Sequence, residues 1–275
     1  MKITDQNIHI RLALTALASL VLAALPARAV IVASDTFSVT ETRPAGSPLN
    51  GSQTEVGNLV WNANAQWQLA GETSDGFVTA TVKNAQNSFA LPFDFASCAQ
   101  HGDVATISMD IKFSRNNDST WYAFGFGSNT TGASITTTGV IYVQVNSRTG
   151  EWSIKNGAGG ISGTFAGTLG SYNRNNFYTW SISYNEVERT VTSITLSLKG
   201  SEPVSVLSNY VIPESVTLGT VASAVLFGQF TSSDMSEQLD NFRLEVNPAI
   251  PEPRTTALIG GVCCLTLVVL RRKSR

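Results

Sequence analysis

Residues 177–184 read Phe-Tyr-Thr-Trp-Ser-Ile-Ser-Tyr, and this stretch decides the fold class. From Tyr178 to Tyr184, large apolar side chains alternate with Thr or Ser. Successive side chains of a β-strand point to opposite faces, so this spacing predicts a strand with one buried face and one solvent-exposed face. A helix would need apolar residues three and four positions apart. No run of 12 or more residues between the two ends of the chain shows that spacing convincingly.

The same alternation recurs along the chain and predicts further strands. It is present at Ile107–Phe113, Ile194–Leu198 and Phe242–Val246. The apolar positions of Ile141–Val145 precede the turn signal Asn146–Gly150 and a second alternating segment, Glu151–Lys155, which predicts a hairpin. Nearer the N-terminus the pattern is less regular, and the candidate strands are Val30–Val39, Leu59–Leu69 and Gly76–Val82. About 12 short strands separated by turns predict an all-β protein built as a two-sheet sandwich.

The net charge of −2 hides an uneven distribution of charge. Residues 1–29 contain three basic residues and one acidic residue, and residues 251–275 contain five and one. The segment between them contains 10 basic and 18 acidic residues, a net charge of −8. So acidic a domain repels phosphate backbones, which argues against nucleic acid as a partner. Its single Cys and single His exclude disulfide scaffolds and Cys/His zinc clusters.

The first 29 residues have the features of a secretory signal peptide. Lys2 and Arg11 precede the apolar run Leu12–Leu25, which is shorter than the ~20 residues that a membrane-spanning helix needs. Ala27 and Ala29 supply the small residues of a cleavage site. We therefore expect export through the Sec translocon and a mature chain that begins just after the signal peptide.

The last 25 residues contain three parts in a fixed order. The motif Pro251-Glu252-Pro253 comes first, an apolar segment follows at 255–270, and the basic residues Arg271, Arg272, Lys273 and Arg275 end the chain. As a helix the apolar segment is about 24 Å long, short for a ~30 Å hydrocarbon core, which suits a transient anchor. The basic end is a stop-transfer signal on the cytoplasmic side. The two prolines keep the preceding segment extended and accessible to a membrane enzyme.

This ending resembles the PEP-CTERM sorting signal of Gram-negative bacteria, in which a Pro-Glu-Pro motif, a short transmembrane helix and an Arg-rich end accompany an N-terminal signal peptide. The same kind of tail is also described as the C-terminal domain of ice-binding proteins. The resemblance implies that a membrane protease of the exosortase type cleaves near the motif and passes the protein to the cell envelope or extracellular matrix, in association with exopolysaccharide. An ordinary C-terminal anchor is the alternative.

The strands between the two ends resemble those of concanavalin A-like (LamG-like) jelly rolls. The likeness rests on Ser34–Phe37, Trp121–Gly127, Phe177–Tyr184 and Leu239–Leu244. It implies a two-sheet jelly roll in which the first and last strands pair. The expected organisation is a signal peptide at 1–29, a β-sandwich domain at 30–246, a linker with the Pro-Glu-Pro motif at 247–254, a transmembrane helix at 255–270 and a cytoplasmic end at 271–275.

Oxygen ligands offer the most plausible metal site. Pairing of the first and last strands would bring Asp35 near Asp240, with Asn241 as a further donor, and extracellular jelly rolls often use such ligands for a structural Ca²⁺. The loop Asn116–Asp118 is a second oxygen-rich segment. Turn chemistry or an exposed acid is the alternative at each place. Apart from this Ca²⁺ site, the sequence predicts no cofactor.

The sequence contains few of the residue patterns that catalytic sites require. Sandwich glycosidases commonly carry an E-x-D-x-x-E strand motif, which is absent here, and the nearest carboxylate pair, Glu186 and Glu188, is expected in a solvated turn. Cys98 and His101 have the spacing for a contact, but no third group is evident to orient them. We therefore expect a protein that is not an enzyme.

Aromatic residues suggest a carbohydrate ligand, because sugar faces stack on rings while polar neighbours bind the hydroxyls. Alternation places Trp180 in the core, whereas Trp152 lies on a hairpin strand where it can be exposed; the other tryptophans are Trp61, Trp67 and Trp121. The favoured interpretation is an exported, non-enzymatic surface protein, and the alternative is a lectin-like module. A divergent glycosidase or an ice-binding protein fits less well, since Thr136–Thr138 is a single run and no repeated ladder.

The C-terminal signal gives a first testable prediction. Deleting residues 251–275 should abolish membrane retention and proteolytic processing, because the motif, the apolar segment and the basic stop signal are lost together. Fractionation of cells that express the full-length and truncated chains measures this. Unchanged localisation of the truncated chain would contradict the sorting interpretation.

Overall fold

The computed structural model describes residues 29–64, 66–73, 75–81, 86–95, 103–113, 121–128, 131, 135–156, 166–169, 172–214, 221–230 and 237–247. Residues 29–247 form a compact unit. Within the described ranges, no helix is long and apolar enough to cross a membrane. Several expected features lie outside these ranges: the signal peptide up to Arg28, the C-terminal segment from Pro248, Cys98, His101 and Asn116–Asp118.

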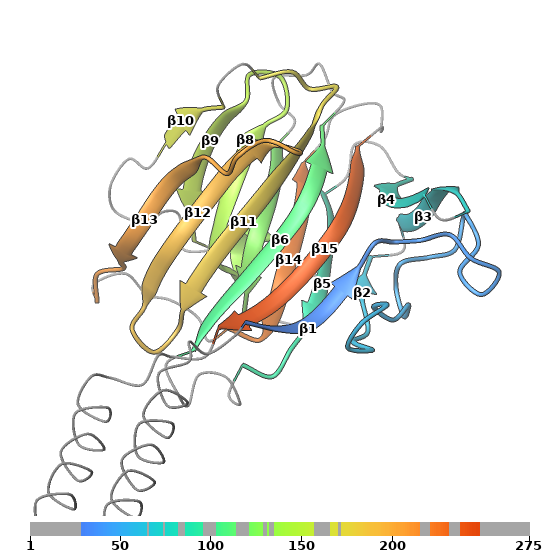
Figure 1. Cartoon of the computed structure of the whole chain (residues 1–275), viewed down its shortest axis with the longest axis horizontal. Coiled ribbons are helices and arrows are strands. Elements are labelled where there is room, and N and C mark those ends of the chain that lie inside the picture. The colour runs from blue at the N-terminus through green and yellow to red at the C-terminus, as the bar shows by residue number, and fades with distance from the viewer. Residues whose placement is uncertain are drawn as a thin grey trace, which may run out of the picture. The chain divides into compact units, whose positions relative to one another are not determined.

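The described residues form two antiparallel sheets that pack face to face (Figure 1). Sheet 1 has eight strands in the order β13-β12-β11-β6-β15-β4-β3, with β1 paired to β15. Its strands are β1 (Val30–Asp35), β3 (Trp67–Glu72), β4 (Asp75–Ala80), β6 (Val104–Lys112), β11 (Phe177–Asn185), β12 (Thr190–Leu198), β13 (Ser205–Val211) and β15 (Gln238–Asn247). The predicted all-β, two-sheet sandwich is confirmed.

Sheet 2 has seven strands in the order β10-β9-β8-β7-β14-β5-β2. Its strands are β2 (Asn62–Ala63), β5 (Gln86–Pro92), β7 (Trp121–Gly127), β8 (Gly139–Asn146), β9 (Glu151–Lys155), β10 (Ala166–Thr168) and β14 (Ser223–Phe230). The short helix α3 (Ile135–Thr138) precedes β8 and contains the Thr run that the sequence offers for ice binding.

The period-2 pattern of β6 and β11 corresponds to burial. Every second residue of β11 is buried from Tyr178 onward, and the residues between them face the other side of the sheet. The two strands pair in register, so Trp180 lies opposite Met109 and Ser181 opposite Ser108. Cross-strand neighbours point to the same face, which places the apolar set of both strands between the sheets.

Aromatic rings join the two sheets across the core. The centroid of the Trp180 ring on β11 lies 6.4 Å from that of Phe124 on β7, and 5.5 Å from that of Phe113, which follows β6. Phe126 of β7 contacts Tyr184 of β11 with centroids 5.8 Å apart. Burial, together with the nearby charge of Glu186, raises the pKa of Tyr184 to about 12, so its phenol stays neutral in the core.

The hairpin predicted at residues 141–155 is present as β8 and β9. The Asn146 side chain organises its turn, because Oδ1 accepts hydrogen bonds from the backbone N–H groups of Arg148 (2.9 Å) and Thr149 (3.1 Å). The turn ends at Gly150, which has a φ of +70° and packs against the Tyr172 ring. A side chain there would collide with that ring, so glycine is required at this position.

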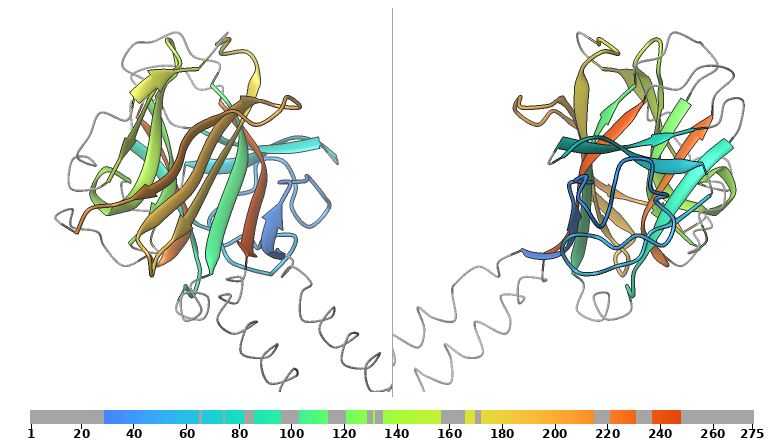
Figure 2. Two further views of the ribbon diagram at one scale, coloured as in Figure 1. Left: turned by 60° about the vertical axis from the view of Figure 1, so that its left-hand side comes forward. Right: turned by 90° about the vertical axis from the view of Figure 1, so that its right-hand side faces the viewer.

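The N-terminal strands are shorter than the sequence predicts. β1 ends at Asp35 because Phe37 adopts a left-handed backbone conformation (φ 52°), which interrupts a strand. The segment expected as one strand at Leu59–Leu69 forms β2 and β3 with an interruption between them. Residues 36–60 instead loop beside β3 and β4 at one end of the sandwich (Figure 2). The expected pairing of the first and last strands is confirmed by β1 and β15.

The alternation on β11 predicts unequal effects of neighbouring substitutions. Ile182→Ala removes a side chain that is fully buried between the sheets and should lower the free energy of unfolding by about 2–5 kcal/mol. Ser181→Ala changes the outer face and should stay within about 0.5 kcal/mol of the parent. Urea unfolding of residues 29–247 measures both, and equal losses would contradict the assigned faces.

Candidate functional site

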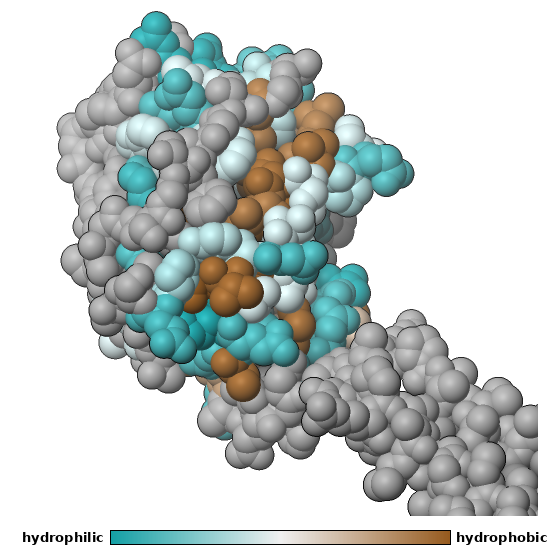
Figure 3. Space-filling model, turned by 90° about the vertical axis from the view of Figure 1, so that its left-hand side faces the viewer, coloured by the Kyte–Doolittle hydropathy of each residue, from teal (hydrophilic) through white to brown (hydrophobic). Residues whose placement is uncertain are grey.

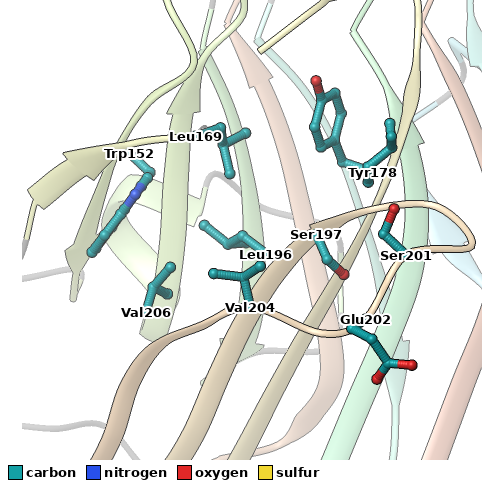
Figure 4. A pocket seen from close by; sticks show the side chains of 10 residues that line it. Trp152, Leu169, Tyr178, Leu196, Ser197, Ser201, Glu202, Val204 and Val206 are labelled. Atoms are coloured by element: carbon teal, nitrogen blue, oxygen red, sulfur yellow. The ribbon is translucent and has the colours of Figure 1, made fainter. Parts of the chain in front are cut away.

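A groove of about 290 Å³ opens at the edge of the sandwich, where β13 ends sheet 1 and β10 ends sheet 2. Trp152 and Leu169 line it from sheet 2, and Leu196 and Val206 line it from sheet 1. The connection Leu198–Val204 between β12 and β13 forms a further wall (Figure 4). Figure 3 shows hydrophobic residues gathered in a band on this side of the molecule, between more polar surfaces.

The groove exists because the core stops before the sheet edges. Trp152 follows the inward alternation of β9, yet it remains partly exposed because its neighbour on the outer side is the three-residue strand β10. Leu198 continues the apolar pattern of β12 but is 41% exposed, so the inward series expected from the sequence ends at Leu196. Trp152 and Leu198 are thus apolar side chains that the facing sheet covers incompletely.

Polar groups lie opposite the tryptophan. Figure 4 shows Ser197, Ser201 and Glu202 on one side of the groove and Trp152 on the other, with Leu196 and Val204 between them. The turn that carries Ser201 is closed by its own backbone, since its N–H donates to the carbonyl of Leu198 (2.9 Å). The groove therefore combines an aromatic ring, an aliphatic floor and a rim of hydroxyl and carboxylate groups.

The structure confirms the core position predicted for Trp180 and also places the other four tryptophans. Trp61, Trp67 and Trp180 are at most 1% exposed and belong to the core. Trp121 is partly exposed on β7, with the ammonium of Lys155 5.9 Å from its ring centroid. Trp152, by contrast, lines the groove with its ring, which makes it the tryptophan best placed to meet a ligand.

A polar cluster lies on the outer face of sheet 1, next to the groove. The Lys199 ammonium is 2.8 Å from Asp110 Oδ2 and 3.6 Å from Asp240 Oδ2. The Asn241 amide donates to both carboxylates at 2.9 Å, and Thr179 Oγ1 donates to Asp110 Oδ1 at 2.6 Å. Asn241 reaches both because it has a left-handed backbone (φ 51°) at an irregularity in the pairing of β15 with β6.

The charged groups of this cluster shift one another's pKa values. Burial acts to lower the pKa of Lys199, but the hydrogen bond and charge of Asp110, with those of Asp240, raise it by more, so the pKa lies above its usual value. Burial raises the pKa of Asp240 against the opposing effects of the Asn241 N–H and of Lys199. The ammonium therefore occupies the position between two carboxylates that a cation would take.

Asp35 lies in a different environment from Asp240. Its carboxylate accepts two hydrogen bonds from the Arg43 guanidinium (3.0 and 3.1 Å) and one from the Trp61 indole N–H (2.8 Å). Asp35 pairs with the buried Phe242 on the inner face of sheet 1, whereas Asp240 pairs with Asp110 on the outer face. The strands meet as predicted, but the two carboxylates have separate partners.

Metal binding by these residues stays a prediction. Among the described residues, no three His, Cys, Asp or Glu side chains converge as a metal site requires.

The expected turn containing Glu186 and Glu188 is present between β11 and β12, and Glu186 Oε1 accepts a hydrogen bond from the backbone N–H of Val221 (3.1 Å). The Glu186 carboxylate therefore takes part in a hydrogen bond that joins this turn to the segment at Val221.

Comparison with known proteins finds likeness of structure alone. No protein-family model matches the chain, and no curated protein matches it in sequence. A Shewanella oneidensis protein of unknown function superposes with a TM-score of 0.51 at 12% identity, over 85% of this chain and 95% of that one. The fold that the two proteins share is the all-β, two-sheet sandwich described above.

Two further solved structures resemble the chain more weakly. Lectin II from Ulex europaeus has a TM-score of 0.47 at 11% identity, over 81% of this chain and 99% of the lectin. Trypanosoma rangeli sialidase has a TM-score of 0.48 at 14% identity, over 88% of this chain but 36% of the sialidase. At such identities, an assignment of function has to come from the site.

The outer-face cluster predicts a measurable coupling. Lys199→Met should lower the free energy of unfolding by about 1–2 kcal/mol, because it leaves the nearly buried Asp110 carboxylate without its ammonium partner. The exposed position of Lys199 keeps the loss at the low end of that expected for a buried pair. In the Asp110→Asn background the same change should cost at least ~0.5 kcal/mol less. Additive losses in urea unfolding would contradict the pairing.

The stabilisation that the Lys199–Asp110 pair contributes depends on pH. The folded state raises the pKa of Lys199, so the stabilisation is fully present below the unfolded value of about 10.4 and is lost as the pH rises through the higher folded value. The stability difference between parent and Lys199→Met should therefore be constant near neutral pH and shrink in strong alkali, which urea unfolding at a series of pH values measures.

Proposed function

We propose that this chain is an exported, non-catalytic carbohydrate-binding module of the cell surface or extracellular matrix. The groove beside Trp152 carries the proposal. It offers an aromatic ring, an aliphatic floor and a rim of Ser201 and Glu202 within one opening. Sugar-binding sites need this combination, because the C–H face of a pyranose stacks on a ring while its hydroxyls bind polar groups at the edge.

The chemistry of the rim favours an uncharged glycan. Glu202 accepts hydrogen bonds from sugar hydroxyls, and the serine hydroxyls donate and accept. A carboxylated sugar would be repelled by Glu202 and by the domain as a whole, whose charge over residues 30–250 is −8. The ligand class is therefore a neutral polysaccharide or oligosaccharide.

The two ends of the chain support the proposed location. A signal peptide at 1–29 sends the chain to the Sec translocon, and the PEP-CTERM-like tail passes it to an exosortase-type membrane protease. Such proteins accompany exopolysaccharide, which supplies a glycan at the place where the domain is displayed. The proposed partners are thus the export and sorting machinery and a surface polysaccharide.

Binding to a glycan array tests the proposed function. Residues 29–247 should retain one or more neutral glycans, and Trp152→Ala should weaken binding by at least ~10-fold, since the stacking surface is removed. Glu202→Gln should weaken it less, because the amide keeps an acceptor oxygen.

The matched control is Trp121→Ala, which removes a partly exposed tryptophan outside the groove and should leave binding unchanged. The array is run in Ca²⁺ and in EDTA, which also tests the predicted metal. Failure to retain any glycan in both conditions, or equal losses for the two tryptophan variants, would overturn the proposal.

A further inference from the structure

A second hollow lies at the edge of the sandwich opposite the Trp152 groove. Its volume is about 500 Å³, and it is formed by the loop 42–53 together with Leu69 of β3. β3 is the last strand of sheet 1 on this side, whereas the groove lies beside β12 and β13 on the other. The right-hand view of Figure 2 faces this loop, and Figure 3 faces the groove. The polar residues that line the 42–53 hollow are Thr42, Arg43, Ser47, Asn50, Ser52 and Gln53.

The backbone around the 42–53 hollow is held by hydrogen bonds to the rest of the domain. The Leu69 N–H donates to the Ser47 carbonyl (2.9 Å). The Gly51 N–H donates to the carbonyl of the fully buried Trp61 (2.8 Å), and the Trp61 N–H donates to the Ser52 carbonyl (2.9 Å). Because these bonds fix the loop beforehand, a ligand that enters the hollow has little backbone to order, which favours binding.

Several side chains in the 42–53 hollow have hydrogen-bonding groups to spare. Within the described part of the chain, the Ser47 hydroxyl and the Gln53 amide make no hydrogen bond. Asn50 Oδ1 accepts from the Ala63 N–H (3.0 Å), which leaves the two donors of its Nδ2 for a ligand. Ser52 Oγ donates to the Leu49 carbonyl (2.8 Å) and can still accept. The hollow therefore offers both donors and acceptors on a fixed frame.

The charges at the 42–53 hollow favour an uncharged ligand. Among the described lining residues, Arg43 alone carries a charge. Its guanidinium donates to both oxygens of the buried Asp35 carboxylate (3.0 and 3.1 Å), and its Nη1 is also 3.6 Å from Glu55 Oε1. One cation thus faces two carboxylates, so an anionic ligand would meet no net positive charge. Pro48 adds an apolar ring to the lining, and the whole set suits the hydroxyls and C–H groups of a neutral sugar.

We infer that the 42–53 hollow is a second saccharide-binding site, and that one domain thereby bridges two chains of a neutral polysaccharide. The inference rests on the proposed function, which supplies the first site at Trp152. In sheet 1, β12 and β3 are five strand positions apart, which corresponds to about 24 Å at ~4.8 Å per strand. The two sites therefore hold different sugar rings, and a domain with two sites cross-links a polysaccharide that a domain with one site would only coat.

Affinity electrophoresis of residues 29–247, in gels that contain dextran, galactomannan or xyloglucan, tests the second site. Trp152→Ala should leave residual retardation in a gel that retards the parent. In that background, the double change Ser47→Ala and Gln53→Ala should raise the dissociation constant at least ~5-fold, because two hydrogen bonds to the ligand are lost. The matched control is Val56→Ser, which changes an exposed side chain of the same loop outside the hollow and should have no effect.

Light scattering from mixtures with the same polysaccharide measures the cross-linking. The parent should raise the scattering, whereas Trp152→Ala alone and the Ser47→Ala, Gln53→Ala variant alone should bind without raising it. Loss of all retardation in Trp152→Ala, or no effect of the loop variant, would overturn the inference and leave the groove as the single site. Retardation that depends on the loop variant and not on Trp152 would instead overturn the proposed groove and support the 42–53 hollow. Absence of retardation in all three gels would overturn the inference for these polysaccharides, whereas the glycan array decides the proposed function.

Discussion

The packing of Trp180 between the sheets is the contact on which the rest of this structure depends. Its ring lies against Phe113 of its own sheet and Phe124 of the facing sheet, at the centre of a core made from alternate residues of every long strand. Because the side-chain period of a strand is two, fixing Trp180 inward fixes Thr179 and Ser181 outward. The polar outer face of sheet 1, including Asp110, follows from the same register.

The groove and the exposed apolar residues lie where this core ends. β13 and β10 lie at the last positions of their sheets, so the two sheets cover the apolar side chains there less completely. Trp152 and Leu196 line the groove for that reason, and Val204 and Val211 are exposed for the same reason. At the other end of sheet 1, the backbone of segment 46–49 is hydrogen-bonded along β3.

The sequence predicted the parts of the fold that depend on local periodicity. The strands around Ile107–Phe113 and Tyr178–Tyr184 and the β8–β9 hairpin could be inferred from it. The pairing of the terminal strands was implied by the resemblance to jelly-roll folds. It could not separate Trp152 from Trp61, because both are aromatic and the difference is whether the neighbouring strand is long enough to cover the ring. Nor could it place Asp240 beside Asp110, since that depends on the irregular backbone at Asn241.

The outer-face cluster and the groove are parts of one arrangement. Leu198 lines the groove, and the next residue, Lys199, holds the turn to the sheet by donating its backbone N–H to the Phe177 carbonyl (2.9 Å) and its ammonium to Asp110. The Phe177 ring lies 5.0 Å from that ammonium and restricts where it can go. Two carboxylates on one face of a sheet would repel each other, and Lys199 offsets that repulsion while it fixes the turn that carries Ser201 and Glu202. Asp110 and Asp240 are therefore connected, through Lys199, to the turn that forms one wall of the groove.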